Sequence, residues 1–130
     1  MPATHATAVM AAPVRAAWGP SGPGARAHLD TCRSALGSDR AVAEILGVSP
    51  SQVSRWRGGQ LPDLDNADRL AGLALVSEML ARWLAPEVRE GWLRGPNAHL
   101  ADRSPAYLIR LGRVADVIGA LEAEKAGVYA

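Results

Sequence analysis

One segment, residues 64–84, constrains the fold most, because its apolar side chains cover too much of a helix to be buried by a single neighbour. Projected at about 100° per residue, the large ones form one continuous arc: Leu70, Leu73, Val76, Met79, Leu80, Trp83 and Leu84. The arc spans roughly half of the helix surface, whereas packing on one neighbour needs a stripe of about 100°. The opposite strip carries Ala71, Glu78 and Arg82. We therefore expect a long central helix with other elements packed on both of its sides.

The residues before this segment predict three shorter helices. Residues 25–36 place Leu29, Cys32 and Leu36 on one face, and Gly37 tolerates the positive φ of a helix end. Ser38 or Asp39 can cap a second helix that ends at Gly47. A third begins at Ser49, where Pro50 occupies the first turn without losing a needed donor.

The residues after Pro86 predict further short helices and a final longer one. One helix ends at Gly95, and Pro96 with Asn97 opens another turn. Ser104 and Pro105 start the next helix, which Gly112 separates from the last. An apolar stripe is expected across that break: Leu111, Val114, Ile118 and Leu121. Because no segment alternates with the period of a strand, the predicted fold is all-α.

Composition places the chain among soluble proteins, with 48% hydrophobic and 21% charged residues. The apolar run in the central segment contains Glu78 and Arg82, which argues against a membrane span. The single cysteine, Cys32, excludes an intramolecular disulfide and suits a reducing compartment, so we expect a cytoplasmic protein. The Ala, Pro and Gly content of residues 1–24 predicts a flexible leader without a signal peptide.

The predicted organisation has four parts. A leader (1–24) precedes a helix-turn-helix module (25–62), a central helix (63–85) and a small C-terminal helical domain (86–130).

The sequence offers no constellation for catalysis. His5, His28 and His99 have no carboxylate at ligand spacing and no thiol nearby. There is no metal signature, no Gly-rich phosphate loop after a strand and no nucleophile elbow. We expect a protein that is not an enzyme and needs no cofactor or metal.

Residues 39–57 meet the demands of a helix-turn-helix. Ala43 is small where two crossing helices approach, and Gly47 suits the turn. The core-facing positions are apolar: Val42, Leu46, Val48, Val53 and Trp56. The pattern resembles the helix-turn-helix of Xre/Cro-like repressors. The alternative is a solvated helix of an Ala-rich bundle, with Trp56 as a core anchor.

The outward side of the third helix would face DNA. Its length of about 12 Å fits a major groove about 12 Å wide. Glutamine can pair with an adenine edge, arginine with guanine or phosphate, and serine with phosphate. The predicted DNA-binding residues are Ser49, Ser51, Gln52, Ser54, Arg55 and Arg57. Because Asp39 and Glu44 nearly offset the nearby arginines, useful affinity would need two or more copies of the chain, and we expect a homo-oligomer.

The C-terminal region carries a second resemblance. The stretch "GWLRGPNAHLADRSPAYLIRLGRVADVIGALEAEKAGVYA" is similar to the toxin-binding domain of the MbcA/ParS/Xre antitoxin family. The matching features are Trp92 with Leu93, Pro96–Asn97, Leu100, Pro105, Leu108, Gly112 and a short apolar tail after Gly127. With the helix-turn-helix, the resemblance covers residues 25–130. It implies that the chain binds a RES-domain toxin, an enzyme that consumes NAD, and that its C-terminal end approaches the toxin's active site.

The resemblance and the exposed tail together assign the toxin-binding residues: Trp92, Pro96, Asn97, Gly127, Val128, Tyr129 and Ala130. For Trp92 and Pro96, packing inside the chain is the first expectation and toxin contact the second. The tail is expected to be too short to fold and to expose Val128 and Tyr129. Its carboxylate beside a tyrosine could mimic an anionic, ring-bearing ligand.

The functional prediction is an antitoxin that occludes its toxin and represses its own operon through operator DNA. The alternatives are a stand-alone Xre-like transcriptional regulator whose C-terminal helices dimerise, and a scaffold protein of similar architecture.

Overall fold

The structure, a computed structural model, describes residues 24–129, and their side chains up to Gly127, as seven α-helices and one 3₁₀ turn with no strand. The helices are α3 (Ala25–Leu36), α4 (Asp39–Leu46), α5 (Pro50–Arg57), α6 (Leu64–Trp83), α7 (Pro86–Arg94), η1 (Ala98–Leu100), α8 (Pro105–Arg110) and α9 (Val114–Tyr129). The all-α prediction is confirmed. The leader predicted for residues 1–24 lies, except for Gly24, outside the described residues, and so does Ala130.

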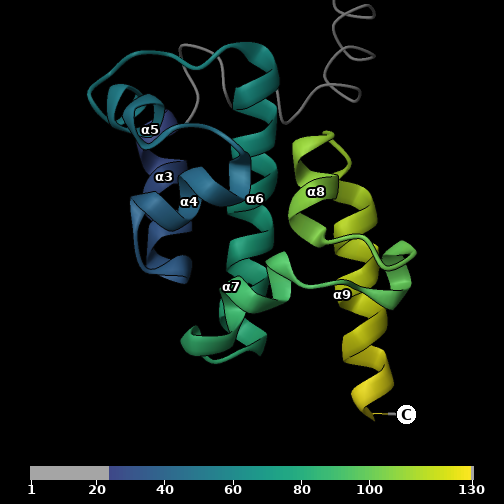
Figure 1. Ribbon diagram of the computed structural model, residues 1–130. Helices are drawn as coiled ribbons and strands as arrows, with labels where there is room; N and C mark the ends of the chain where they lie inside the picture. Colours follow the sequence, from purple (N-terminus) through teal and green to yellow (C-terminus); the bar gives the residue numbers. More distant parts are fainter. Residues whose placement is uncertain (1–23, 130) are drawn as a thin grey trace, which may run out of the picture.

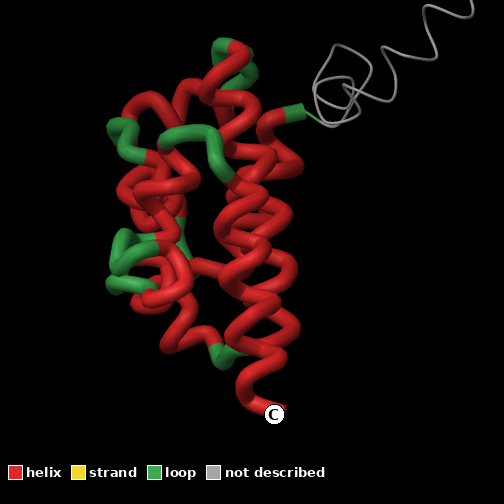
Figure 2. The backbone as a smooth tube through the Cα atoms, turned by 90° about the vertical axis from the view of Figure 1, so that its right-hand side faces the viewer, coloured by secondary structure: helices red, strands yellow, loops and turns green. Residues whose placement is uncertain are grey.

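The long central helix, α6, lies in the middle of the molecule (Figure 1). Helices α3, α4 and α5 lie on one side of it and α8 and α9 on the other, as its wide apolar arc predicted. Viewed from the side, short loops join the helices and α9 runs to the C-terminal end (Figure 2). The helix thus lies between the predicted helix-turn-helix module (25–62), called the N-terminal module below, and the predicted C-terminal domain (86–130).

Local signals account for the helix boundaries. Five of the helix starts are capped by side chains that each accept a hydrogen bond from a backbone N–H of the first turn: Ser38, Ser49, Asp63, Asn97 and Ser104. Of the two candidates for the start of α4, Ser38 is the cap, since its Oγ accepts from Ala41 N. Gly37 and Gly47 end α3 and α4 with φ of 98° and 74°. These left-handed conformations are the reason for glycine there.

Buried side chains of the helices on both sides of α6 form one hydrophobic cluster. The buried part of α6 is wider than predicted, because Ala71 is 9% exposed and Gly72 is buried. A Cβ at Gly72 would lie 3.1 Å from Val114 Cβ, so α9 approaches α6 closely there. The solvent-facing strip contains Glu78 and Arg82, as expected, but Leu75 in place of Ala71.

Two expectations for the last helices are wrong. Leu111 is 49% exposed. The chain turns at Gly112, with φ of 77°, so Leu111 does not continue the apolar stripe of α9. The core residues of α9 are Val117 and Leu121, both 0% exposed, and Ala120, which is 3% exposed. The tail is not too short to fold, because α9 continues to Tyr129. Extending an existing helix needs no new nucleus, and Gly127 costs only about 1 kcal/mol relative to alanine.

No helix in the described part of the chain is both long and apolar enough to cross a membrane.

Candidate functional site

The α4–α5 pair is joined by a tight, well-bonded turn. Val48 N donates to Ala43 O (3.0 Å) and Gly47 N to Glu44 O (3.2 Å), the two hydrogen bonds of a Schellman motif. Ala43 is 0% exposed, as expected for a residue at a close approach. Val53 and Trp56 bury the inner side of α5 in the core. The opposite side of α5 is therefore fixed toward solvent.

The predicted DNA-binding residues of α5 share that solvent-facing side, with one exception treated below. Ser51, Ser54 and Arg55 are exposed and Gln52 is half-buried. Arg55 Nη2 donates to Gln52 Oε1 (3.1 Å), so the glutamine amide and the guanidinium lie side by side. Ser49 is exposed at the start of α5, where its hydroxyl accepts from Gln52 N. A pair of an amide and a guanidinium can hydrogen-bond to base edges in a major groove.

Arg57, the exception, is engaged inside the N-terminal module. Its Nε and Nη2 donate to the two carboxylate oxygens of Asp39 (2.7 and 2.8 Å), and its Nη1 donates to Asp30 (2.7 Å). The hydrogen bonds from Arg57 lower the pKa of the Asp39 carboxyl. The two carboxylates raise the pKa of Arg57 in turn. Spacing along the chain did not reveal this bridge from Arg57, which connects the end of α5 to the start of α4 and the middle of α3.

In the C-terminal domain, a carboxylate joins two of the predicted toxin-binding residues. Trp92 Nε1 donates to Glu124 Oε2 (2.8 Å) and Asn97 Nδ2 donates to Glu124 Oε1 (2.7 Å). Asn97 is 4% exposed, and its Oδ1 accepts from His99 N. Sequence reasoning missed Glu124. The available signal was an acidic residue on the same face of the last helix as Val117 and Leu121.

Two of the remaining predicted residues of this domain, Pro96 and Gly127, are more accessible. Pro96 is exposed. Gly127 is exposed and lines an open cleft of about 430 Å³, together with Trp83, His99, Ala123 and Glu124. Val128 and Tyr129 continue α9, and Ala130 lies outside the described residues. The structure thus brings Trp92, Asn97 and the cleft together around Glu124, with the end of α9 beside them.

No group of three or more His, Cys, Asp or Glu side chains in residues 24–127 is arranged to hold a metal ion. Cys32 is buried, and burial raises the pKa of its thiol to about 12. A thiol with such a pKa stays protonated at neutral pH and is a poor nucleophile.

Comparison with known proteins gives two similar groups, while no family model matches the chain. The mycobacterial cidal antitoxin MbcA of Mycobacterium bovis and of Mycobacterium tuberculosis is 37% identical over 89 residues, which are 68% of this chain and 79% of the relative. A chain of the crystal structure of the M. tuberculosis MbcT–MbcA toxin–antitoxin complex superposes with a TM-score of 0.66 and 32% identity. That superposition covers 81% of this chain and 96% of the other.

Proposed function

This chain belongs to the family of MbcA-type antitoxins, and from that membership we infer that it is the antitoxin of a toxin–antitoxin pair. The observation that carries the inference is the 37% identity to MbcA over 79% of that protein's length. The 0.66 TM-score to a chain of a toxin–antitoxin complex agrees with it. Its relatives are antitoxins rather than enzymes, so the chain acts by binding a toxin.

The partner we propose is a RES-domain enzyme that consumes NAD in the cytoplasm. This identity rests on the resemblance of residues 86–130 to the toxin-binding domain of the family. The chain would inhibit by occlusion, with the end of α9 covering the active-site opening. Two features of the structure support that role for α9. Its last turns extend past the end of α6 (Figure 1), and Ala126 and Gly127 are exposed small residues that allow a partner's backbone to come close.

The predicted toxin-binding residues would have different roles in a toxin-binding surface at this end of the C-terminal domain. Pro96, Gly127, Val128, Tyr129 and Ala130 would contact the toxin. Trp92 and Asn97 would hold that surface in place, because their polar side-chain groups are bonded to Glu124.

The test is inhibition of the RES-type enzyme encoded beside this chain, followed as NAD consumption. Full-length chain should co-purify with the enzyme and stop the reaction. Deleting Val128–Ala130 should weaken inhibition at least tenfold by our estimate, since it removes the end that enters the opening. Ala115→Ser, at the other end of α9, is the matched control and should inhibit normally. If the truncated chain inhibits as well as the full chain, occlusion by the α9 end is wrong. If the full chain neither binds nor inhibits, the proposed partner is wrong.

We also propose that the α4–α5 pair is a helix-turn-helix that binds operator DNA of the chain's own operon and represses it. Gln52 and Arg55 would contact base edges, and Ser49, Ser51 and Ser54 would contact phosphates. Arg57 would orient α5 through Asp39 instead of contacting DNA, because its guanidinium is occupied. With a formal net charge of +1, one copy has little general attraction for DNA, so binding would require a homo-oligomer on repeated half-sites.

The test is binding of a duplex from the region upstream of the chain's own reading frame. Arg55→Ala should weaken binding about tenfold or more, the usual loss for one base-contacting arginine. Arg82→Ala removes the same charge from the exposed strip of α6, away from α5, and should have little effect. Equal losses in the two variants would reduce the interaction to general charge attraction and contradict a reading role for α5.

A further inference from the structure

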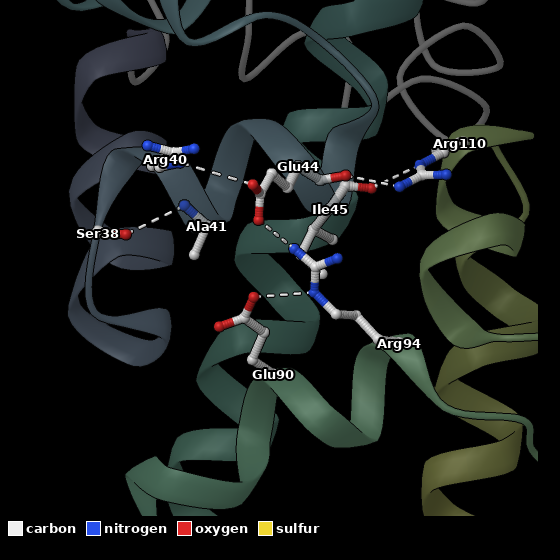
Figure 3. A network of polar contacts seen from close by, with 8 residues as sticks. All are labelled: Ser38, Arg40, Ala41, Glu44, Ile45, Glu90, Arg94 and Arg110. Atoms are coloured by element: carbon white, nitrogen blue, oxygen red, sulfur yellow. Dashed lines mark hydrogen bonds and ion pairs between the residues drawn. The ribbon is translucent and has the colours of Figure 1, made fainter.

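The C-terminal domain holds the end of α4, just before the turn into α5. Arg110, in the last turn of α8, donates from Nε to Ile45 O (2.9 Å) and from Nη2 to Glu44 O (2.6 Å). Figure 3 shows the guanidinium of Arg110 pointing from α8 at these two carbonyls of α4. Sixty-five residues separate Arg110 from Ile45.

These contacts supply hydrogen-bond donors to the backbone carbonyls at the C-terminal end of α4. The Schellman bonds of Gly47 and Val48 supply donors to the carbonyls of Glu44 and Ala43. Ile45 O is one carbonyl further on, and Arg110 Nε donates to it. A guanidinium at a helix C-terminus is also favoured by the partial negative charge of the aligned carbonyls.

The side chain of Arg110 also lies against the turn itself. A Cβ at Gly47 would be 3.0 Å from Arg110 Nε and 3.1 Å from its Cδ. Gly47 is thus constrained by its left-handed φ and by the arginine that covers it.

A second arginine of the C-terminal domain reaches the same turn of α4. Arg94 of α7 donates from Nη2 to the carboxylate of Glu44, while its Nε donates to Glu90 (2.8 Å). Arg40 lies on the same carboxylate, with its Nε 3.7 Å from Glu44 Oε2 (Figure 3). The last turn of α4 is therefore held through its carbonyls by α8 and through the Glu44 side chain by α7.

The two ends of α5 are secured by different means. Its C-terminal end is tied to Asp39 and Asp30 through Arg57. Its N-terminal end follows directly from the turn at Gly47 and Val48, and this is the end that would enter a DNA groove. Whatever fixes the turn fixes the direction in which that end points.

We propose that Arg110 is a positioning residue for DNA binding: it holds the α4–α5 turn so that the N-terminal end of α5 is presented in one orientation. The proposal rests on the proposed DNA-binding function of α5. It makes the C-terminal domain a structural part of the DNA-binding site, in addition to its role toward the toxin.

The experiment uses the full-length chain and two variants, Arg110→Ala and Arg110→Lys. Lysine keeps the charge but lacks the planar fork that reaches two carbonyls. Arg113→Ala is the matched control, because that exposed arginine pairs with Asp116 within its own domain. The readouts are amide hydrogen exchange at Gly47 and Val48, affinity for the upstream duplex, and complex formation with the neighbouring toxin.

Arg110→Ala should speed exchange at Gly47 and Val48 and weaken duplex binding, each by about tenfold, as expected for the loss of one or two ordinary hydrogen bonds. Toxin binding should stay unchanged, Arg110→Lys should lose part of the effect, and Arg113→Ala should match the parent. Arg55→Ala, which removes a proposed direct contact, should weaken duplex binding without changing exchange at the turn.

Unchanged exchange at Gly47 and Val48 in Arg110→Ala would overturn the proposal, whatever the duplex affinity. So would faster exchange with unaltered affinity in a chain that binds the duplex. If Arg110→Ala does not fold, Arg110→Lys decides alone, and parent-like behaviour in both readouts overturns the proposal. If the parent chain has no affinity for the duplex, the proposed DNA-binding function is wrong, and so is the proposed effect of Arg110 on DNA binding. The exchange rates then still report whether Arg110 holds the turn.

Discussion

Glu124 accepts hydrogen bonds from two side chains that lie far from it in the sequence, Trp92 and Asn97. Trp92 belongs to α7 and Asn97 caps η1, so one carboxylate of α9 joins three elements of the C-terminal domain. The amide of Asn97 is nearly inaccessible to water and relies on these protein partners. A buried donor that loses its acceptor retains the cost of leaving water.

Replacing this carboxylate should therefore lower the stability of the chain. We expect Glu124→Ala to reduce the free energy of unfolding by about 2 kcal/mol, because it leaves Asn97 Nδ2 and Trp92 Nε1 without their acceptor. Glu124→Gln keeps one acceptor oxygen and should lose less. Urea unfolding followed by circular dichroism measures both. Glu122→Ala, an exposed site on the same helix, is the control, and a loss as large as that in Glu124→Ala would argue against the bridge.

The Asp39–Arg57 pair predicts a pH dependence of the folding stability that can be assigned to the Asp39 carboxyl. Hydrogen bonds from Arg57 hold the pKa of Asp39 below its ordinary value of 3.8 in the folded chain. A carboxyl with a lowered folded-state pKa contributes stability above its unfolded-state pKa and loses it as the pH falls through the folded-state value.

The urea midpoint of the parent chain should thus fall between about pH 5 and about pH 2.5 by more than that of Asp39→Asn. At neutral pH, Asp39→Asn should be the less stable of the two, because the asparagine no longer pairs with the charge of Arg57. Asp102→Asn serves as a control for an exposed carboxylate. An identical pH slope in the parent and in Asp39→Asn would contradict the assignment.

Among the elements, α6 and α9 approach each other closely at a glycine, Gly72. The Cα of Gly72 faces Val114, and a Cβ there would be 3.1 Å from both Cβ and Cγ2 of the valine. Val114 is in the first turn of α9, so this contact fixes where α9 begins to pack on α6. Additional volume at the contact would have to be accommodated by moving α9.

Gly72→Val should destabilise the chain by about 1–3 kcal/mol, the usual cost of overfilling a packed contact, despite the better helix propensity of most residues over glycine. Val114→Ala makes room, so the double variant Gly72→Val/Val114→Ala should be more stable than Gly72→Val alone. Thermal unfolding of the four chains of this cycle measures the coupling. Additive effects would show that the two residues do not share a contact.

The elements also show which parts of the fold a sequence discloses. Helix ends were predictable because their causes are local: Ser38, Ser49 and Asn97 cap the residues that follow them, and Gly37 and Gly47 end the helices before them. The prediction for the end of α9 was wrong because a glycine near the end of a helix often stops it, whereas α9 continues through Gly127 to Tyr129.

Contacts between distant residues were not predictable from spacing. Arg57 was expected on the DNA-facing side, yet its bridge to Asp39 depends on the way α4 and α5 cross. Glu124 and Arg110 look like ordinary exposed-face residues in sequence, and their partners are brought to them only by the assembled helices. The solvent-facing group of Gln52 and Arg55 was predicted, because burial of Val53 and Trp56 on the other side dictates it.

At the scale of the whole molecule, the predicted boundaries at residues 62 and 85 do not divide the hydrophobic core. Buried residues from Ala25 to Leu121 form one cluster around α6. Arg89 adds polar contacts across the boundary, since it donates to Leu84 O (2.9 Å) and to Ala35 O (3.2 Å). A continuous core with bridging arginines favours unfolding as one unit.

We therefore expect a single cooperative transition. In a urea titration followed by NMR, the indole N–H signals of Trp56 and Trp92 should disappear with the same midpoint, although they lie in different parts of the chain. Arg113→Ala should shift both midpoints equally or neither. Separate midpoints would mean that the N-terminal module and the C-terminal domain unfold independently.

The α5 helix and the last turn of α9 lie at opposite ends of the molecule (Figure 1). A fluorescent protein fused behind the last residue would therefore stand far from α5. If α5 represses the operon and the end of α9 inhibits the toxin, as proposed, cells that carry this fusion should still repress the promoter but should no longer neutralise the toxin. The distance between the two proposed sites would then appear as a strain in which repression persists and protection from the toxin is lost.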